Sequence, residues 1–111
     1  MFLSLTIKIK AMSDMLDLCL EPDGKPPQPH QRLPPLSNSY LLVPGRSNVV
    51  SLKQYLIQKL GLKDSSPVEL LCNEYPVGDQ FSLSFISRYW SKTDDEVLLL
   101  KYRLQEEGNT S

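Results

Sequence analysis

The stretch SLKQYLIQKLGL, residues 51–62, constrains the fold most, because its apolar residues recur with a clear helical period. They fall at i, i+3, i+4 and i+8 and so share one face of a helix, at Leu52, Tyr55, Leu56 and Leu60. Ser51 and Gln54 have the spacing of a capping box, and Gly61 is placed to end the helix in a left-handed conformation. A single apolar stripe of this kind needs a flat surface to pack on. The sequence therefore predicts a sheet covered by one main helix.

Runs of alternating apolar residues on both sides of the helix predict the strands of that sheet. They are MLDLCLEP (15–22), SYLLVP (39–44), SSPVELLCN (65–73) and DEVLLLKYRL (95–104). The last run is too continuously apolar for an edge, so we expect it at the centre. Pro44 suits an edge strand, because proline has no N–H to donate to a neighbour. The segment FSLSFISRYW, residues 81–90, is predicted as a short strand or turn followed by a single helical turn.

The order of these elements is strand, long loop, strand, helix, strand, short strand or turn, strand. A leading hairpin, a helix crossing the sheet and a final strand inserted at the centre make an α+β fold of the ubiquitin-like β-grasp type, a mixed sheet packed against one main helix. The strand order would be two-one-five-three-four. The alternation alone also permits a ferredoxin-like α+β domain, although the second helix which that fold needs is weak in this sequence.

The chain has 111 residues, the size of one domain. We expect the domain to span residues 14–104, with a proline-rich loop at 22–38 that holds almost no large apolar residue and should be mobile. Residues 1–13 alternate like an extra strand, but they could equally be a frayed start. Their apolar run is broken by lysines too early for a signal peptide and is far shorter than the roughly 20 residues of a membrane span. Residues 105–111 are expected to form a disordered tail.

Composition and motifs exclude several classes of function. A net charge of −1 supplies no positive field for a phosphate backbone, so we expect no direct contact with nucleic acid. We also expect no membrane partner. Cys19, Cys72 and the single histidine, His30, are too few and too scattered for a zinc site, so we expect no metal and no cofactor. The two cysteines are expected to be buried, reduced thiols in a reducing compartment, although a disulfide between neighbouring strands is conceivable.

Catalysis is not expected either. A cysteine nucleophile needs an accessible thiolate and a nearby base, whereas Cys72 lies at the end of an apolar strand and His30 lies in the proline-rich loop. Glu69 and Glu74 are five positions apart along a strand and turn, which should place them on opposite faces. We therefore predict a protein that is not an enzyme and has no catalytic residue.

Four segments carry a family likeness, namely LDLCLEP (16–22), VVSLKQYLIQKLGL (49–62), VELLCNEYPVGDQFSLSF (68–85) and VLLLKYR (97–103). In order and spacing they resemble the ubiquitin-like RAWUL domain of Polycomb group RING finger proteins, without the RING, over residues 14–103. LCNE and LLLKYR are the more specific matches. The family's Trp motif is shifted here by about one position, at Trp90, and Pro76 stands where the family has an aliphatic residue. A plant group of RING-type ubiquitin ligases carries a similar domain, which NSYL and KQYL resemble.

The likeness implies a non-catalytic protein-interaction domain in the nucleus. RAWUL domains bind segments of Polycomb subunits and corepressors by β-strand addition, in Polycomb repressive complex 1 type assemblies linked to histone ubiquitination. The free N–H and C=O groups of an edge strand at residues 39–43 could accept such a segment. The predicted partner-binding residues are Ser39, Tyr40, Leu41, Leu42 and Val43, with Arg46 at the rim. Tyr40 and Leu42 should lie on one face of that strand. A plant-type ligase domain and a homodimer formed through the same edge are the alternatives.

Overall fold

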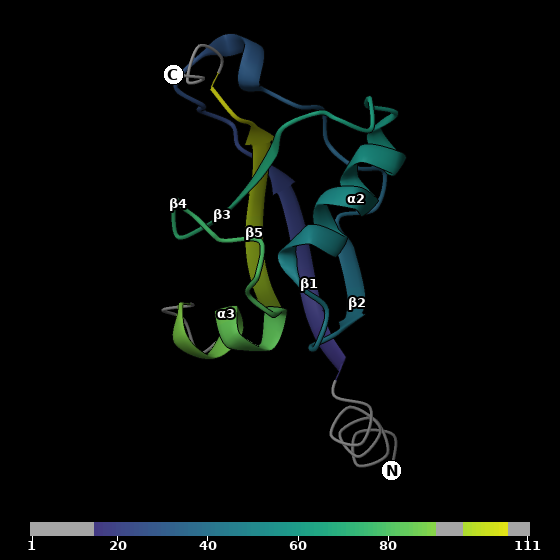
Figure 1. Cartoon of the computed structure of the whole chain (residues 1–111), viewed down its shortest axis with the longest axis vertical. Coiled ribbons are helices and arrows are strands. Elements are labelled where there is room, and N and C mark those ends of the chain that lie inside the picture. The colour runs from purple at the N-terminus through teal and green to yellow at the C-terminus, as the bar shows by residue number, and fades with distance from the viewer. Residues whose placement is uncertain (1–14, 91–96, 107–111) are drawn as a thin grey trace.

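The computed structural model describes residues 15–90 and 97–106 of the chain. Its elements are, in chain order, β1 (Met15–Pro22), the short 3-10 helix η1 (Pro29–Gln31), β2 (Tyr40–Pro44), α2 (Val49–Leu60), β3 (Val68–Cys72), β4 (Tyr75–Pro76), α3 (Leu83–Tyr89) and β5 (Val97–Leu104). The strands form one sheet, and α2 lies across one face of it (Figure 1).

The sheet has the order β2-β1-β5-β3-β4, which is the order that the sequence predicts. β1 pairs antiparallel with β2 and parallel with β5, and β3 pairs antiparallel with β5, so the sheet is mixed. β5 is the central strand, as its continuous apolar run indicates, and β2 is an edge. The predicted α+β arrangement, with a hairpin, a crossing helix and a last strand at the centre, is confirmed.

The core lies between α2 and the sheet. Val49, Leu52 and Leu56 of the helix are buried against alternate residues of the three inner strands. Those strand residues are Leu18 and Leu20 of β1, Leu98, Leu100 and Tyr102 of β5, and Val68, Leu70 and Cys72 of β3. Burying this many large apolar side chains is the main stabilising term for a domain of this size.

The N-cap of helix α2 lies three residues before the predicted one, Ser51. Asn48 is its N-cap, and the Asn48 side chain accepts a hydrogen bond from the backbone N–H of Ser51 at 3.1 Å. The Ser51–Gln54 capping box is therefore wrong, because an asparagine at the N-cap already satisfies that N–H. The predicted stop is right, since Gly61 has φ +67° and its N–H points back to the carbonyls of Ile57 and Gln58.

The segment that follows β3 differs from the prediction in two respects. The short fourth strand is Tyr75–Pro76, which pairs with β3 across a turn at Asn73 and Glu74. Residues 81–90 contain no ladder strand, and the helical turn that the sequence predicts here is longer than expected. It is helix α3, Leu83–Tyr89, whose N-cap Ser82 accepts a hydrogen bond from the N–H of Phe85 at 3.1 Å. The apolar residues at 81, 83 and 85 suggest a strand, but Ser82 provides the helix start.

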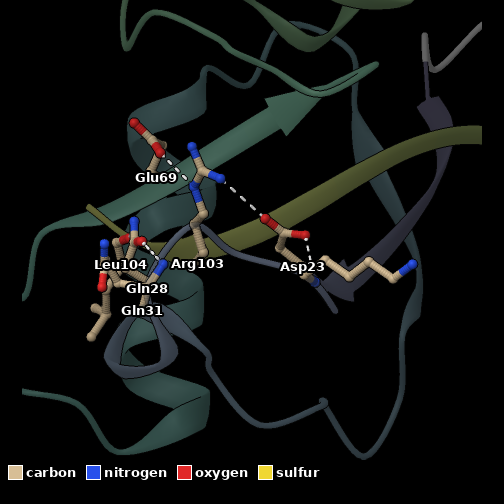
Figure 2. A network of polar contacts seen from close by, with 7 residues as sticks. Asp23, Gln28, Gln31, Glu69, Arg103 and Leu104 are labelled. Carbon is tan, nitrogen blue, oxygen red and sulfur yellow. Dashed lines mark hydrogen bonds and ion pairs between the residues drawn. The ribbon is translucent and has the colours of Figure 1, made fainter. Parts of the chain in front are cut away.

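The proline-rich connection between β1 and β2 is fixed to the sheet. Leu33 is buried in the core and Leu36 packs against it, so the expectation of a loop without core residues does not hold. Gln31 is 1% exposed, and its side-chain amide donates to the carbonyl of Leu104 at 3.0 Å while its oxygen accepts from the N–H of Gln28 at 2.7 Å (Figure 2).

A second set of polar contacts attaches the start of the same connection. Figure 2 shows Arg103 between two carboxylates: its Nε donates to Glu69 at 2.8 Å and its Nη1 to Asp23 at 3.1 Å. Burial lowers the pKa of the Arg103 guanidinium, but the bonds and charges of Glu69 and Asp23 outweigh this, and its pKa is raised. Gln105, placed in the tail from the sequence, donates its N–H to Pro67 at 2.7 Å. The possible extra strand at 1–13 lies outside the described residues.

Candidate functional site

The predicted site is the edge strand β2, and two of its large apolar side chains are exposed. Tyr40 is 66% exposed and Leu42 is 57% exposed, whereas Leu41 and Val43 pack against the core. The predicted division of the strand into two faces is therefore confirmed. Ser39 is partly buried, and its carbonyl accepts from the N–H of Leu20 at 2.8 Å.

Hydrogen-bonded and non-hydrogen-bonded pairs alternate along an antiparallel ladder. The bond from Leu20 to Ser39 fixes which residues bond inward, because the register continues with Leu18 opposite Leu41 and Leu16 opposite Val43. Ser39, Leu41 and Val43 thus direct their backbone groups to β1. The backbone groups of Tyr40, Leu42 and Pro44 point away from the sheet.

Two local contacts close both ends of this outer row. The N–H of Tyr40 donates to the side-chain oxygen of Asn38 at 3.2 Å, an Asx-turn contact. The carbonyl of Pro44 accepts from the N–H of Ser47 at 3.0 Å, and proline has no N–H of its own. Within the described part of the chain, the open outer groups of β2 are consequently the N–H and C=O of Leu42 and the C=O of Tyr40.

Of the two outward side chains of β2, Tyr40 continues an apolar row across the sheet face opposite α2, whereas Leu42 lies opposite Asp17. Tyr40 is opposite Cys19, and Cys19 is opposite Leu99, which is 45% exposed. Cys19, the middle member of this row, is itself buried. A strand added at β2 would lengthen this row on one face of the sheet.

A groove of about 260 Å³ lies on the other side of β2, between the strand and α2. Its lining is mainly apolar and consists of Leu41, Leu42, Val43, Ser47, Ser51, Leu52 and Tyr55. Leu42, whose outer backbone groups have no partner among the described residues, is one of its lining residues. A side chain of an added strand that alternates to this side would meet the groove.

Two basic residues adjoin the lining of the groove, Arg46 and Lys59. Arg46 is exposed and precedes the lining residue Ser47, and the Lys59 ammonium lies 5.7 Å from the ring centroid of Tyr55. Lys53, in contrast, is paired with Asp79. Among residues 15–90 and 97–106, no ion pair involves Arg46 or Lys59, and none of the groove's lining residues is acidic.

The two thiols are arranged for packing. Cys19 lies on the open face of the sheet and Cys72 on the α2 face, with β5 between their strands, and both are free and buried. Burial raises the pKa of each thiol, and the Glu21 carboxylate raises that of Cys19 further. A raised pKa keeps a thiol protonated and poorly nucleophilic at neutral pH.

The other residues considered for catalysis are also accounted for. His30 lies exposed in η1, Glu69 is held by Arg103, and Glu74 lies in the turn after β3. In the described residues, no three His, Cys, Asp or Glu side chains are close enough to hold a metal ion. No helix within the described ranges combines the length and the apolar character needed to cross a bilayer.

Sequence reasoning missed the residues that limit the edge and those that line the groove. Asn38 two residues before Tyr40 was a usable signal, because Asn in a loop often bonds the backbone N–H two positions on. The remaining lining residues of the groove come from the turn and helix that follow β2, and only the packing of α2 on the sheet places them beside the strand. They are Ser47, Ser51, Leu52 and Tyr55.

Comparisons with known proteins bear on the fold. A scan of the sequence against protein-family models finds no match, and a search of curated proteins finds none. Among solved structures, ATG8 of Trypanosoma brucei is similar, with a TM-score of 0.72 and 19% sequence identity, over 92% of this chain and 84% of that one. This likeness bears on the fold alone, and it agrees with the ubiquitin-like β-grasp arrangement described above.

Proposed function

We propose that this chain is a non-catalytic protein-interaction domain that binds an extended segment of a partner protein along β2. The observation that carries the proposal is the edge itself: among the described residues, the outer N–H and C=O of Leu42 and the C=O of Tyr40 have no partner, and both side chains are well exposed. β-strand addition uses such groups, with main-chain bonds giving affinity and alternate side chains giving specificity.

The partner class rests on the sequence likeness to RAWUL domains. LCNE, at residues 71–74, lies at the end of β3 and its turn, and LLLKYR, at 98–103, lies in the central strand. We propose that the partner is a Polycomb subunit or corepressor and that the domain acts in the nucleus, in a chromatin-repression assembly of the Polycomb repressive complex 1 type linked to histone ubiquitination. A role in a plant-type RING ubiquitin ligase would use the same edge.

The test is a pulldown of Polycomb subunits from nuclear extract with the full chain and an edge variant. Tyr40→Asp combined with Leu42→Asp places two carboxylates on the exposed face of β2 and should abolish capture. The single change Leu41→Asp is unsuitable, because Leu41 packs against the core. Tyr89→Asp on α3 is a matched control, since Tyr89 is 67% exposed and distant in sequence from the edge.

Capture of Polycomb subunits by the control but not by the edge variant would support both parts of the proposal. Equal capture by both variants would defeat the edge as the binding site. Capture of plant-type ligase partners or other proteins, with no chromatin subunit, would defeat the Polycomb assignment and leave the edge open to test with those proteins.

A homodimer is the second candidate, and the position of Leu42 favours it, because its open N–H and C=O could pair with those of Leu42 in a second copy. In an antiparallel two-fold pairing centred on Leu42, the two Leu42 residues would exchange two hydrogen bonds, and each Tyr40 would lie opposite Pro44 of the second copy. Size-exclusion chromatography with light scattering decides it. A monomer at all micromolar concentrations excludes the homodimer, and a dimer that Leu42→Asp dissociates supports it.

A further inference from the structure

The groove beside β2 specifies the chemistry of the segment that the edge receives. We infer that this partner segment pairs with Leu42 and carries an apolar residue and an acidic residue two positions apart, both directed toward the groove between β2 and α2. The inference rests on the proposed function, because it concerns the same edge, and it goes beyond it by naming the side chains that are selected.

The open backbone groups determine the register. The closed N–H of Tyr40 and the closed carbonyl of Pro44 leave Leu42 as the one described residue of β2 with both outer groups open. An added strand in either direction can make three main-chain bonds here, two with Leu42 and one with the carbonyl of Tyr40. The partner residue beside Leu42 is thereby fixed as the centre of the contact.

Alternation along a strand then decides where the partner's side chains go. The central partner residue shares the face of Leu42, which is the open face of the sheet. The residues immediately before and after it share the face of Leu41 and Val43. Those two positions, which are two residues apart, are the ones that meet the groove.

The lining of the groove selects an apolar side chain at one of these positions. Leu41, Val43 and Leu52 supply apolar surface, and the volume of about 260 Å³ is enough for one large side chain. An apolar group would bury this surface together with its own and gain about 25 cal/mol for each Å² removed from water. A charged side chain buried in the groove would find no residue of opposite charge among the lining residues.

The rim selects an acidic residue at the other position. Arg46 is exposed and precedes the lining residue Ser47, Lys59 lies beside the lining residue Tyr55, and neither has an ion-pair partner in the described ranges. A carboxylate next to either cation adds a favourable charge contact at a partly screened site, whereas a basic residue would be repelled. The positive charges of Arg46 and Lys59 are therefore the reason to expect an acidic residue in the partner segment.

The experiment selects random ten-residue peptides, displayed on phage, against the full 111-residue chain and then measures the binding of a labelled synthetic copy of the enriched sequence. We expect enriched peptides to carry an apolar residue and an Asp or Glu at i and i+2. Arg46→Glu together with Lys59→Glu should lower the affinity of the chain for the synthetic peptide by at least about tenfold. Ser51→Trp, which fills the groove, should weaken it similarly.

Lys101→Glu is the matched control, because Lys101 lies on β5 away from the groove and should leave the affinity unchanged. Leu42→Pro, which removes the outward N–H, separates the two proposals. Peptides that lose binding to Leu42→Pro but show no acidic preference, or are unaffected by the double charge reversal, would overturn the inference and leave the proposed function standing. Peptides insensitive to Leu42→Pro, or no enrichment at all, would count against the edge itself.

Discussion

Leu41 and Leu42, adjacent in β2, direct their backbone N–H groups to opposite sides: that of Leu41 bonds to β1 and that of Leu42 points away from the sheet. The same substitution at the two positions should consequently have different effects. This pair therefore separates binding from folding at a single strand.

Leu42→Pro should abolish partner binding while changing the free energy of unfolding by less than about 1 kcal/mol, since proline is tolerated at edge positions whose N–H faces solvent. Leu41→Pro should lower the free energy of unfolding by at least about 2 kcal/mol, because it leaves a ladder carbonyl unpaired and removes a packed side chain. Urea denaturation and probe binding on both variants check this. If the Leu42→Pro variant unfolds at a lower urea concentration than the Leu41→Pro variant, the N–H of Leu42 does not point away from the sheet.

Glu69→Gln should lower the free energy of unfolding by about 1–3 kcal/mol, because it removes the charge from a hydrogen bond to the largely buried Arg103 guanidinium. The measurement is urea denaturation at neutral pH. Glu106→Gln is the control, since Glu106 is exposed and forms no ion pair with a described residue. Equal stability of the two variants would show that the contact with Arg103 contributes nothing.

Glu74→Gly should raise the free energy of unfolding by roughly 0.5–1 kcal/mol. Asn73 and Glu74 have φ of 52° and 72°, the left-handed region that a two-residue hairpin turn uses and that glycine adopts without strain. The gain is reduced by the greater freedom of glycine in the unfolded chain. Glu74→Ala keeps a side chain at positive φ and should show no gain in the same thermal or urea unfolding experiment.

Stability should fall as the pH rises above about 9. Burial raises the pKa of Cys19 and Cys72 above the ordinary value of 9.0 and that of Tyr102 above 10.0, so the folded chain holds these protons more tightly than the unfolded chain. Their contribution is complete below the unfolded pKa values and is lost as the pH passes through the folded ones. Urea denaturation at pH 7.5 and pH 10 should show the fall, and Cys72→Ala should reduce it. A stability that rises over this range would contradict the assignment.

The fold could be predicted from the sequence to the extent that its signals are local. The helical period at 51–62, the alternation in β1 and β2 and the apolar run of β5 are properties of neighbouring residues, and each produced the right element. The start of α2 was placed late because Asn48 and Ser51 are both good N-cap residues. The helical turn in residues 81–90 was predicted but placed too late, because Phe81, Leu83 and Phe85 alternate like a strand, whereas Leu83 and Ile86 are buried on one face of α3.

The sequence allowed the binding strand to be predicted, but not the groove and the local contacts that surround it. The edge position of residues 40–44 follows from Pro44 and the strand order. The limits set by Asn38 and Ser47, and the groove formed with Tyr55, depend on contacts between separate elements. The anchoring of the proline-rich loop was missed for the same reason, because Gln31 finds its partner at Leu104, 73 residues later.

The central place of β5 has a consequence for the order in which the molecule is assembled. β1 and β3 do not pair with each other; each pairs with β5, the last strand to be synthesised. The loop that precedes β2 also depends on this strand, through the bonds of Gln31 to Leu104 and of the Tyr102 hydroxyl to the carbonyl of Pro34. A nascent chain that ends before Val97 therefore lacks the strand that joins β1 to β3, and we expect the sheet to form only after β5 has been synthesised.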